Sequence, residues 1–66
     1  MRLQIDRDND AVYLRLDESP IVESEEVQPG VILDFDGEGK VIGIELLGMA
    51  RRISPDILRT FQLETA

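Results

Sequence analysis

Apolar and polar residues alternate near the start of the chain. Leu3 and Ile5 lie between polar neighbours, and after a break rich in Asp and Asn at residues 7–10 the alternation resumes with Val12 and Leu14. A period of two predicts strands with one buried face, and the polar break predicts a hairpin loop. A loop of about two or four residues places Ile5 opposite Val12 and Leu3 opposite Leu14, which keeps the aliphatic side chains on one face.

The same alternation occurs over residues 31–35 and 42–46. The intervening Gly37-Glu38-Gly39 provides glycines, which tolerate the positive φ angles of tight hairpin turns. A loop centred on Gly37-Glu38 places Leu33 opposite Ile42. The pattern therefore predicts a second antiparallel hairpin.

The stretch between the hairpins is more polar. Asp17-Glu18-Ser19-Pro20 predicts the end of a strand, and glutamates then recur through residues 21–28. We interpret residues 21–28 as an irregular or edge strand, because charged side chains discourage pairing with a further strand. Gln28-Pro29-Gly30-Val31 fits a type II turn, in which proline fixes φ and glycine accepts a positive φ.

The periodicity changes after Gly48. Ser54 suits a helix N-cap, Pro55 suits the first helical position, and Asp56 suits the positive end of the helix dipole. The apolar residues that follow have helical spacing, which predicts a helix over residues 54–63. A helix of about two to three turns is marginal alone, so we expect it to dock on the aliphatic side of the sheet.

These elements predict one domain over residues 1–66, because the chain is too short for a second core. The expected fold class is α+β, mainly β. It comprises an antiparallel sheet of two hairpins plus an edge segment within residues 1–47, with one short C-terminal helix over residues 54–63 packed on the sheet. The expected core contains the apolar side chains of both hairpins and the helix, namely Leu3, Ile5, Val12, Leu14, Leu16, Val31, Leu33, Phe35, Ile42, Ile44, Leu46, Ile57, Leu58 and Phe61.

The chain is acidic, with 14 Asp and Glu residues against 7 Lys and Arg residues and a formal net charge of −7. Nucleic-acid surfaces need clustered basic residues, so a general phosphate-binding function is not expected. Apolar runs are too short to span a membrane, and the first residues turn polar at once, unlike those of a signal peptide. We therefore expect a soluble cytoplasmic protein.

The composition also limits the chemistry. The chain has no His and no Cys, which excludes Ser-His-Asp and Cys-His nucleophiles and ordinary zinc sites. We expect no cofactor and no small-molecule substrate, because so small a core leaves little volume for a closed pocket. The protein is predicted not to be an enzyme. The exception left open is a subunit that contributes carboxylates to a composite site.

Two acidic segments have some features of calcium loops. Asp6-Arg7-Asp8-Asn9-Asp10 has the spacing of alternate acidic ligands, but Ala11 stands where such a loop needs glycine and the next residues predict a strand. Asp34-Phe35-Asp36-Gly37-Glu38-Gly39 is similar but short, and a hairpin turn uses the same residues. We interpret both segments as turns and expect no dedicated metal site.

Two pairs of arginines are interpreted as solvent-facing. Arg2 and Arg15 fall opposite each other in the first hairpin, where like charges are unfavourable. Either their side chains splay into solvent or acidic groups lie between them. Arg51-Arg52 is interpreted as a solvated connection into the helix.

The other side of the sheet carries a second group of apolar residues. Tyr13, Ile32 and Val41 point away from the aliphatic side, and Gly43 lies among them in mid-strand. Glycine inside a strand often marks a close approach by another backbone or ring. One short helix covers one side of a sheet, so either residues 18–28 fold across this surface or a partner does. Tyr13, Ile32, Val41 and Gly43 are therefore the candidate partner or dimer surface.

Four segments, in this order and spacing, resemble the domain of unknown function 2283 family of small, mostly bacterial proteins. The resemblance extends over roughly residues 5–50 and is carried by Asp10–Leu16, Ser24–Val27, Gly30–Asp34 and Gly39–Leu47. It implies a compact, β-rich domain. It implies no established activity, substrate or catalytic residue.

The leading functional hypothesis is a non-enzymatic interaction module that self-associates as a homodimer or binds a protein partner. The alternative is an antitoxin-like inhibitor, whose acidic sheet blocks the cationic cleft of a basic protein such as a nuclease. Neither hypothesis involves nucleic acid or a membrane as the partner.

Overall fold

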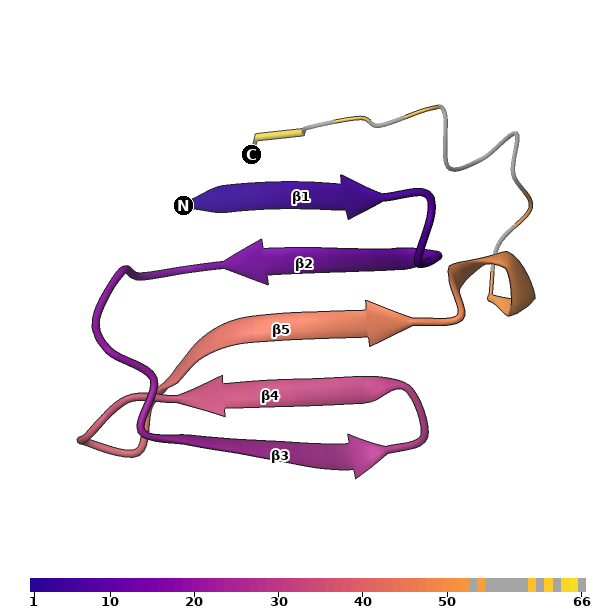
Figure 1. Ribbon diagram of the computed structural model, residues 1–66. Coiled ribbons are helices and arrows are strands. Elements are labelled where there is room, and N and C mark those ends of the chain that lie inside the picture. Colours follow the sequence, from indigo (N-terminus) through magenta and orange to yellow (C-terminus); the bar gives the residue numbers. More distant parts are fainter. Residues whose placement is uncertain (53, 55–59, 61, 63, 66) are drawn as a thin grey trace.

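One antiparallel sheet accounts for nearly all the regular structure in the computed structural model (Figure 1), which describes residues 1–52, 54, 60, 62, 64 and 65. Its strands are β1 (Arg2–Asp6), β2 (Ala11–Arg15), β3 (Glu23–Gln28), β4 (Val31–Phe35) and β5 (Val41–Leu47). They are arranged in the order β1-β2-β5-β4-β3. The two predicted hairpins are therefore present, and they are joined side by side through β2 and β5.

The first hairpin has the predicted register. Leu3 lies opposite Leu14 and Ile5 opposite Val12, with residues 7–10 forming the loop. The loop begins at Asp6, whose carboxylate accepts hydrogen bonds from the backbone N–H (3.1 Å) and side-chain amide (2.8 Å) of Asn9. This Asp-to-Asn bonding closes a tight turn, as the composition of the break indicated.

The second hairpin corrects the predicted register by two residues. Leu33 lies opposite Ile44 rather than Ile42, and the ladder is irregular between Asp34 and Phe35. The loop is longer than expected, because the Asp36 carboxylate accepts the backbone N–H groups of Glu38 and Lys40, each at 2.9 Å. A shift of two residues preserves the face on which each side chain lies, so the hydrophobic alternation does not distinguish the two registers.

The segment predicted as an irregular or edge strand is β3, which lies at one edge of the sheet and has a register shift between Glu26 and Gln28. Gly30, in the turn between β3 and β4, has a φ of +81°. This value agrees with the predicted type II turn, which requires a positive φ at its third residue.

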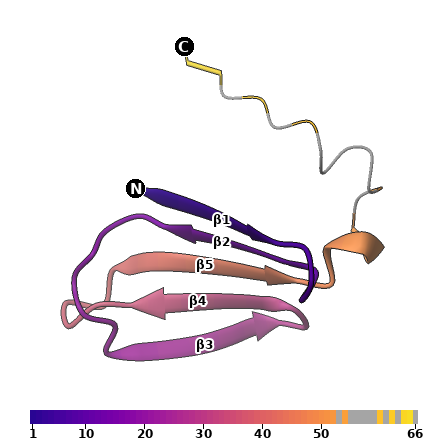
Figure 2. The ribbon, with the colours of Figure 1, turned by 45° about the horizontal axis from the view of Figure 1, so that its top comes forward.

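After β5 the chain forms a short 3-10 helix, η1 (Met49–Arg51), which packs against the first hairpin loop (Figure 2). Asp10 holds this helix: its backbone carbonyl accepts the N–H of Met49 at 3.0 Å, and its carboxylate accepts the N–H of Ala50 at 2.9 and 3.0 Å. Asp10 itself has a positive φ of 52°. The loop and the end of β5 are thus tied together by one residue.

The expected helix over residues 54–63 lies mostly outside the described residues. Ile57, Leu58 and Phe61 of the expected core also lie outside them. Ser54, Thr60 and Gln62 are described and are not helical. The described part of the chain therefore contains no α-helix and is mainly β rather than α+β. Within that same part, no helix has the length and apolar character needed to cross a membrane.

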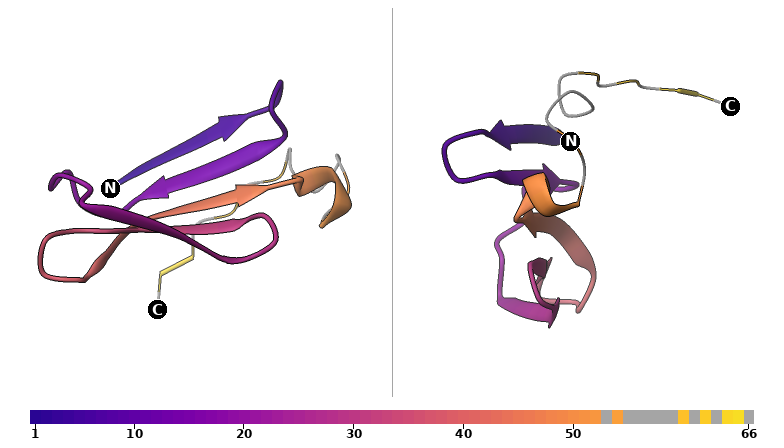
Figure 3. Two further views of the ribbon diagram at one scale, coloured as in Figure 1. Left: turned by 60° about the horizontal axis from the view of Figure 1, so that its bottom comes forward. Right: turned by 90° about the vertical axis from the view of Figure 1, so that its right-hand side faces the viewer.

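The sheet forms a single twisted layer (Figure 3), and this limits burial. Among the described residues, the buried apolar side chains are Ala11, Ile42 and Met49, and no large side chain is fully buried. Leu3 and Ile5 remain 39% and 41% exposed. For the strand residues of the expected core, the prediction of which side chains share a face is confirmed by the register. Most of these side chains are only partly buried, because no described segment packs on that face.

Candidate functional site

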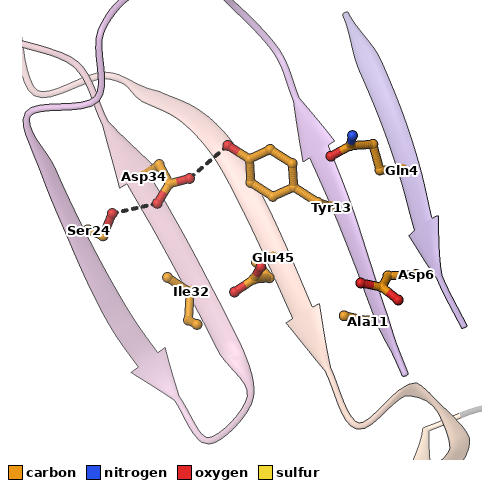
Figure 4. Close-up of a pocket in the computed structure, with 8 residues that line it drawn as sticks. All are labelled: Gln4, Asp6, Ala11, Tyr13, Ser24, Ile32, Asp34 and Glu45. Atoms are coloured by element: carbon orange, nitrogen blue, oxygen red, sulfur yellow. Dashed lines mark hydrogen bonds between the residues drawn. The ribbon is translucent and has the colours of Figure 1, made fainter. Parts of the chain in front are cut away.

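A hydrogen-bonded cluster lies on the polar face of the sheet, the side that carries Gln4, Tyr13, Asp34 and Glu45 (Figure 4). The Tyr13 hydroxyl donates to Asp34 Oδ2 at 2.9 Å, and the Ser24 hydroxyl donates to Asp34 Oδ1 at 2.6 Å. Asp34 is 8% exposed, and each of its oxygens has a donor. A buried carboxylate is tolerated when its oxygens are bonded in this way.

Gly43 makes this cluster possible. It lies on β5 opposite both Arg15 and Asp34. A Cβ at this position would lie 2.6 Å from the Tyr13 hydroxyl oxygen and 2.7 Å from Asp34 Oδ2. The close approach predicted at Gly43 is therefore made by a tyrosine of the same chain.

A hollow of about 430 Å³ lies over the polar face (Figure 4) and spans all five strands. Its acidic side chains are those of Asp6, Asp34 and Glu45, and no Arg or Lys of the described residues lines it. The side-chain amide of Asn9, and secondarily its backbone N–H, hold the pKa of the Asp6 carboxyl below its ordinary value. The hollow therefore presents hydrogen-bond acceptors and negative charge. The remaining lining residues are Gln4, Ala11, Tyr13, Ser24 and Ile32.

The two opposed arginines of the first hairpin have separate partners. Arg2 forms a bidentate pair with Glu18, with Nε and Nη2 at 2.8 and 3.0 Å from the carboxylate oxygens. The hydrogen bond and the opposite charge lower the pKa of Glu18 and raise that of Arg2. Arg15 instead donates to the carbonyls of Asp17 and Ser19 and, at 3.3 Å, to the Tyr13 hydroxyl. Arg2 is therefore held by an acidic side chain, and Arg15 is held by backbone carbonyls and the Tyr13 hydroxyl.

The interpretation of Arg51-Arg52 as a solvated connection is incomplete for Arg52, which is hydrogen-bonded to the backbone. Its guanidinium donates to the carbonyl of Pro29 at 2.9 Å and to that of Leu47 at 3.2 Å. These bonds connect the β3–β4 turn to the end of β5. Gly30 leaves room for this guanidinium, since a Cβ there would lie 2.9 Å from Nη2.

The described residues include no group of three or more Asp or Glu side chains arranged to hold a metal ion. In the first aspartate-rich segment, Asp6 bonds to Asn9 and Asp10 bonds to the η1 backbone. In the second, Asp34 bonds to Tyr13 and Ser24, and Asp36 closes the β4–β5 loop. These carboxylates stabilise turns and strand contacts.

The opposite side of the sheet is apolar over β1, β2, β5 and β4, and we call this four-strand surface the aliphatic face. On β3 the same side carries Glu25, which lies opposite Leu33. Directly opposed residues of β1, β2, β5 and β4 form two rows of four aliphatic side chains. None of these eight side chains is buried, although none is charged. The rows are Leu3, Leu14, Ile44 and Leu33, and Ile5, Val12, Leu46 and Val31.

Comparison with known protein families matches residues 2–49 to the family described as protein of unknown function DUF2283. The match includes all five strands and covers most of the chain. The chain belongs to the DUF2283 family. No curated protein and no solved structure matches it. The family resemblance carried by the four sequence segments is therefore confirmed.

The DUF2283 sheet brings together three of the four residues of the predicted partner surface. Tyr13 and Ile32 line the same hollow, and Gly43 lies against the Tyr13 hydroxyl. Val41 lies apart at the start of β5, where it is 36% exposed and lines a separate depression of about 590 Å³.

Sequence reasoning missed Asp34 as the centre of the polar cluster. A charged residue at an alternate strand position predicts exposure, whereas Asp34 is among the most buried side chains described. The available signal was Gly43, because a strand position without a side chain leaves space for a neighbour on each adjoining strand. Its occupants, from β2 and β4, follow from the strand order and register.

Proposed function

We propose that this DUF2283 protein is a non-enzymatic interaction module that self-associates by packing its aliphatic face on that of a second copy. The observation that carries the proposal is the pair of aliphatic rows across four strands, none of whose side chains is buried among the described residues. A continuous apolar surface of this kind on a soluble chain is typical of an interaction site. The polar cluster of Tyr13, Asp34 and Ser24 instead supports the sheet from the other side.

A second copy suits this face for geometric reasons. Antiparallel sheets commonly pack face to face at about 10 Å, with the aliphatic side chains of the two layers interdigitating. The same surface on both copies satisfies the two-fold symmetry of most homodimers. A chain of 66 residues is short of buried area, so the second layer supplies what one sheet lacks.

Charge supports the same orientation. Each chain carries a net charge of −7, so two copies repel each other, and the repulsion is smallest where their contact avoids acidic side chains. The two rows contain no acidic residue, whereas β3, beside them, carries Glu23, Glu25 and Glu26. The aliphatic face is therefore the surface on which two copies approach with the least repulsion.

Sedimentation equilibrium of the full chain at about 1–100 μM, a range suited to modest interfaces, tests the proposal. We expect a mass above the 7.5 kDa of one chain. Leu14→Gln places a polar group in the middle of one row and should weaken association at least about tenfold, since burying an unpaired amide is costly. Val22→Gln is the matched control, because Val22 is 69% exposed and lies outside the rows.

A monomer at every concentration would end the self-association proposal. So would a Leu14→Gln variant that remains folded and sediments as the wild type does. A Val22→Gln variant that dissociates as readily as Leu14→Gln would show that the aliphatic rows are not the contact. Circular dichroism on each variant establishes that it is folded.

A second candidate function is inhibition of a basic protein, in the manner of an antitoxin. The observation favouring it is the hollow on the polar face, whose described lining includes Asp6, Asp34 and Glu45 and no Arg or Lys. Such a surface complements a cationic cleft. Purification from the native host should then yield a basic partner that Glu45→Lys releases and Leu14→Gln retains. Retention by Glu45→Lys would remove this candidate.

A further inference from the structure

Among the described residues, no strand pairs with the outer edge of β1 (Figure 1). In that part of the chain β1 pairs with β2 alone, all five residues of β1 are exposed, and its ladder has no register shift. Its sequence has no proline or glycine. Natural edge strands usually carry bulges, prolines or repeated like charges that discourage further pairing, and β1 has none of these.

The direction of the backbone groups on β1 follows from one hydrogen bond. The N–H of Leu16 donates to the carbonyl of Ile42 at 2.8 Å, so the backbone N–H and C=O groups of Leu16 are directed toward β5. Along an antiparallel strand, successive residues direct their N–H and C=O groups to alternate sides. The backbone N–H and C=O groups of Tyr13 are therefore directed toward β1, where Tyr13 lies opposite Gln4. The backbone groups of Gln4 are thus hydrogen-bonded to β2.

The backbone groups of the residues on either side of Gln4 are directed away from β2. The N–H and C=O groups of Leu3 and Ile5 are directed out of the sheet, toward the open edge. In an antiparallel pair of β1 strands centred on Gln4, Leu3 lies opposite Ile5 of the second copy. These residues form hydrogen-bonded pairs on each side of the two-fold axis, and Arg2 lies opposite Asp6 of the second copy.

We propose that two copies of this chain join through β1 in this register, which makes one continuous sheet from two five-stranded halves. Centring on Gln4 uses the whole strand and sets opposite charges against each other at both ends. Shifting by two residues in either direction sets Arg2 against Gln4 or Gln4 against Asp6, and it leaves residues of β1 unpaired. The charges therefore select the register.

The charged residues have capacity for these contacts. Arg2 uses Nε and Nη2 to bind Glu18, so Nη1 remains for a second acceptor, and the Arg2 side chain is 55% exposed.

The opposite edge of the sheet, formed by β3, is unsuited to self-pairing. On β3 an antiparallel copy would bring glutamates together, and its ladder is interrupted between Glu26 and Gln28.

This contact goes beyond the face-to-face packing proposed above and does not rest on it. The register keeps Leu3 and Ile5 on one side, so the aliphatic face of one copy continues into that of the other. The edge uses backbone groups and the ends of β1, whereas face packing uses the centre of the sheet. The two contacts are therefore separable by substitution.

Charge reversal followed by mixing tests the edge contact. Arg2→Asp makes both ends of β1 acidic, and Asp6→Arg makes both ends basic. We expect each variant alone to lose the edge contact, weakening that association about tenfold or more, and an equimolar mixture to regain it. Native mass spectrometry reads the result directly, because the mixed dimer has its own mass. A contact within one chain cannot be restored by mixing two variants.

Glu18→Gln is the matched control, since it removes the intrachain partner of Arg2 and leaves β1 unchanged. It should associate as the wild type does. No excess of mixed over like-with-like dimer in the mixture would overturn the proposal, as would a Glu18→Gln variant that dissociates as Arg2→Asp does.

Hydrogen exchange on the wild type gives an independent test that requires no variant. The amides of Leu3 and Ile5 should become protected as protein concentration rises, whereas that of Gln4 should be protected at low concentration as well. Rapid exchange of Leu3 and Ile5 at every concentration would overturn the edge contact even if Leu14→Gln disrupts self-association. Mixed-dimer formation that Leu14→Gln leaves intact would support the edge contact and show that it is independent of the aliphatic face.

Discussion

A residue without a side chain determines the polar face. Gly43 lies in mid-strand, yet the Tyr13 hydroxyl and the Asp34 carboxylate occupy the volume that a Cβ would fill, at 2.6 and 2.7 Å from its position. The backbone at Gly43 does not have a positive φ. The glycine is therefore required by space and not by its conformational freedom.

Gly43→Ala should consequently destabilise the fold. Overpacking of this kind typically costs about 1–3 kcal/mol, partly offset by about 0.4–1 kcal/mol from a less flexible unfolded chain. Urea unfolding measures the difference. Adding Tyr13→Phe removes one of the two crowded oxygens, so the double variant should lose less stability than the sum of the single variants. Strict additivity, or an unchanged Gly43→Ala midpoint, would contradict this account.

At the scale of elements, the first hairpin is tied down by ion pairing and by the docking of η1. Arg2 at the start of β1 holds Glu18 beyond the end of β2, and Asp10 in the loop holds Met49 and Ala50. Both contacts join segments that are distant in sequence. The hairpin is therefore positioned by more than its own ladder.

The Arg2–Glu18 contact makes this element sensitive to acid. The pKa of Glu18 in the folded chain is lowered by Arg2, so protonation favours the unfolded state. Its contribution is complete above the unfolded pKa of about 4.3 and is lost as the pH falls through the lower folded value. The urea midpoint of Glu18→Gln should therefore fall less between pH 7 and pH 3 than that of the wild type.

The control for that measurement is Glu23→Gln, which removes an equal charge from β3. Its urea midpoint should fall between pH 7 and pH 3 by as much as that of the wild type. Acid also reduces the general repulsion of a chain with a net charge of −7, an effect of the opposite sign that both variants share. An equal fall of the urea midpoint in the two variants would show that the contact between Arg2 and Glu18 contributes nothing to the loss of stability in acid.

At the scale of the whole molecule, the described residues form one layer with two unlike sides. The polar side contains a satisfied cluster around Asp34, while the other side presents uncharged aliphatic rows. A layered domain normally buries its apolar side against a second layer. Face packing and edge pairing use different surfaces, so together they would produce an assembly larger than a dimer.

Sequence reasoning succeeded where the information is local. The alternation of side chains predicted both hairpins and their faces, and the loop of residues 7–10 was short enough to determine that Leu3 pairs with Leu14. It failed for the pairing of Leu33, because hydrogen bonds from Glu38 and Lys40 to Asp36 lengthen the turn and a two-residue shift leaves the pattern unchanged.

The sequence by itself determined the strands, the side on which each residue lies, the glutamate-rich edge and the family, because each of these depends on neighbours along the chain. Only the tertiary structure decided that β2 lies beside β5, and this places Tyr13 and Asp34 on either side of Gly43. It also decided that Asp10 holds η1 and that Arg52 reaches Pro29. These contacts join residues separated by long stretches of chain, and no periodicity records which distant strand becomes a neighbour.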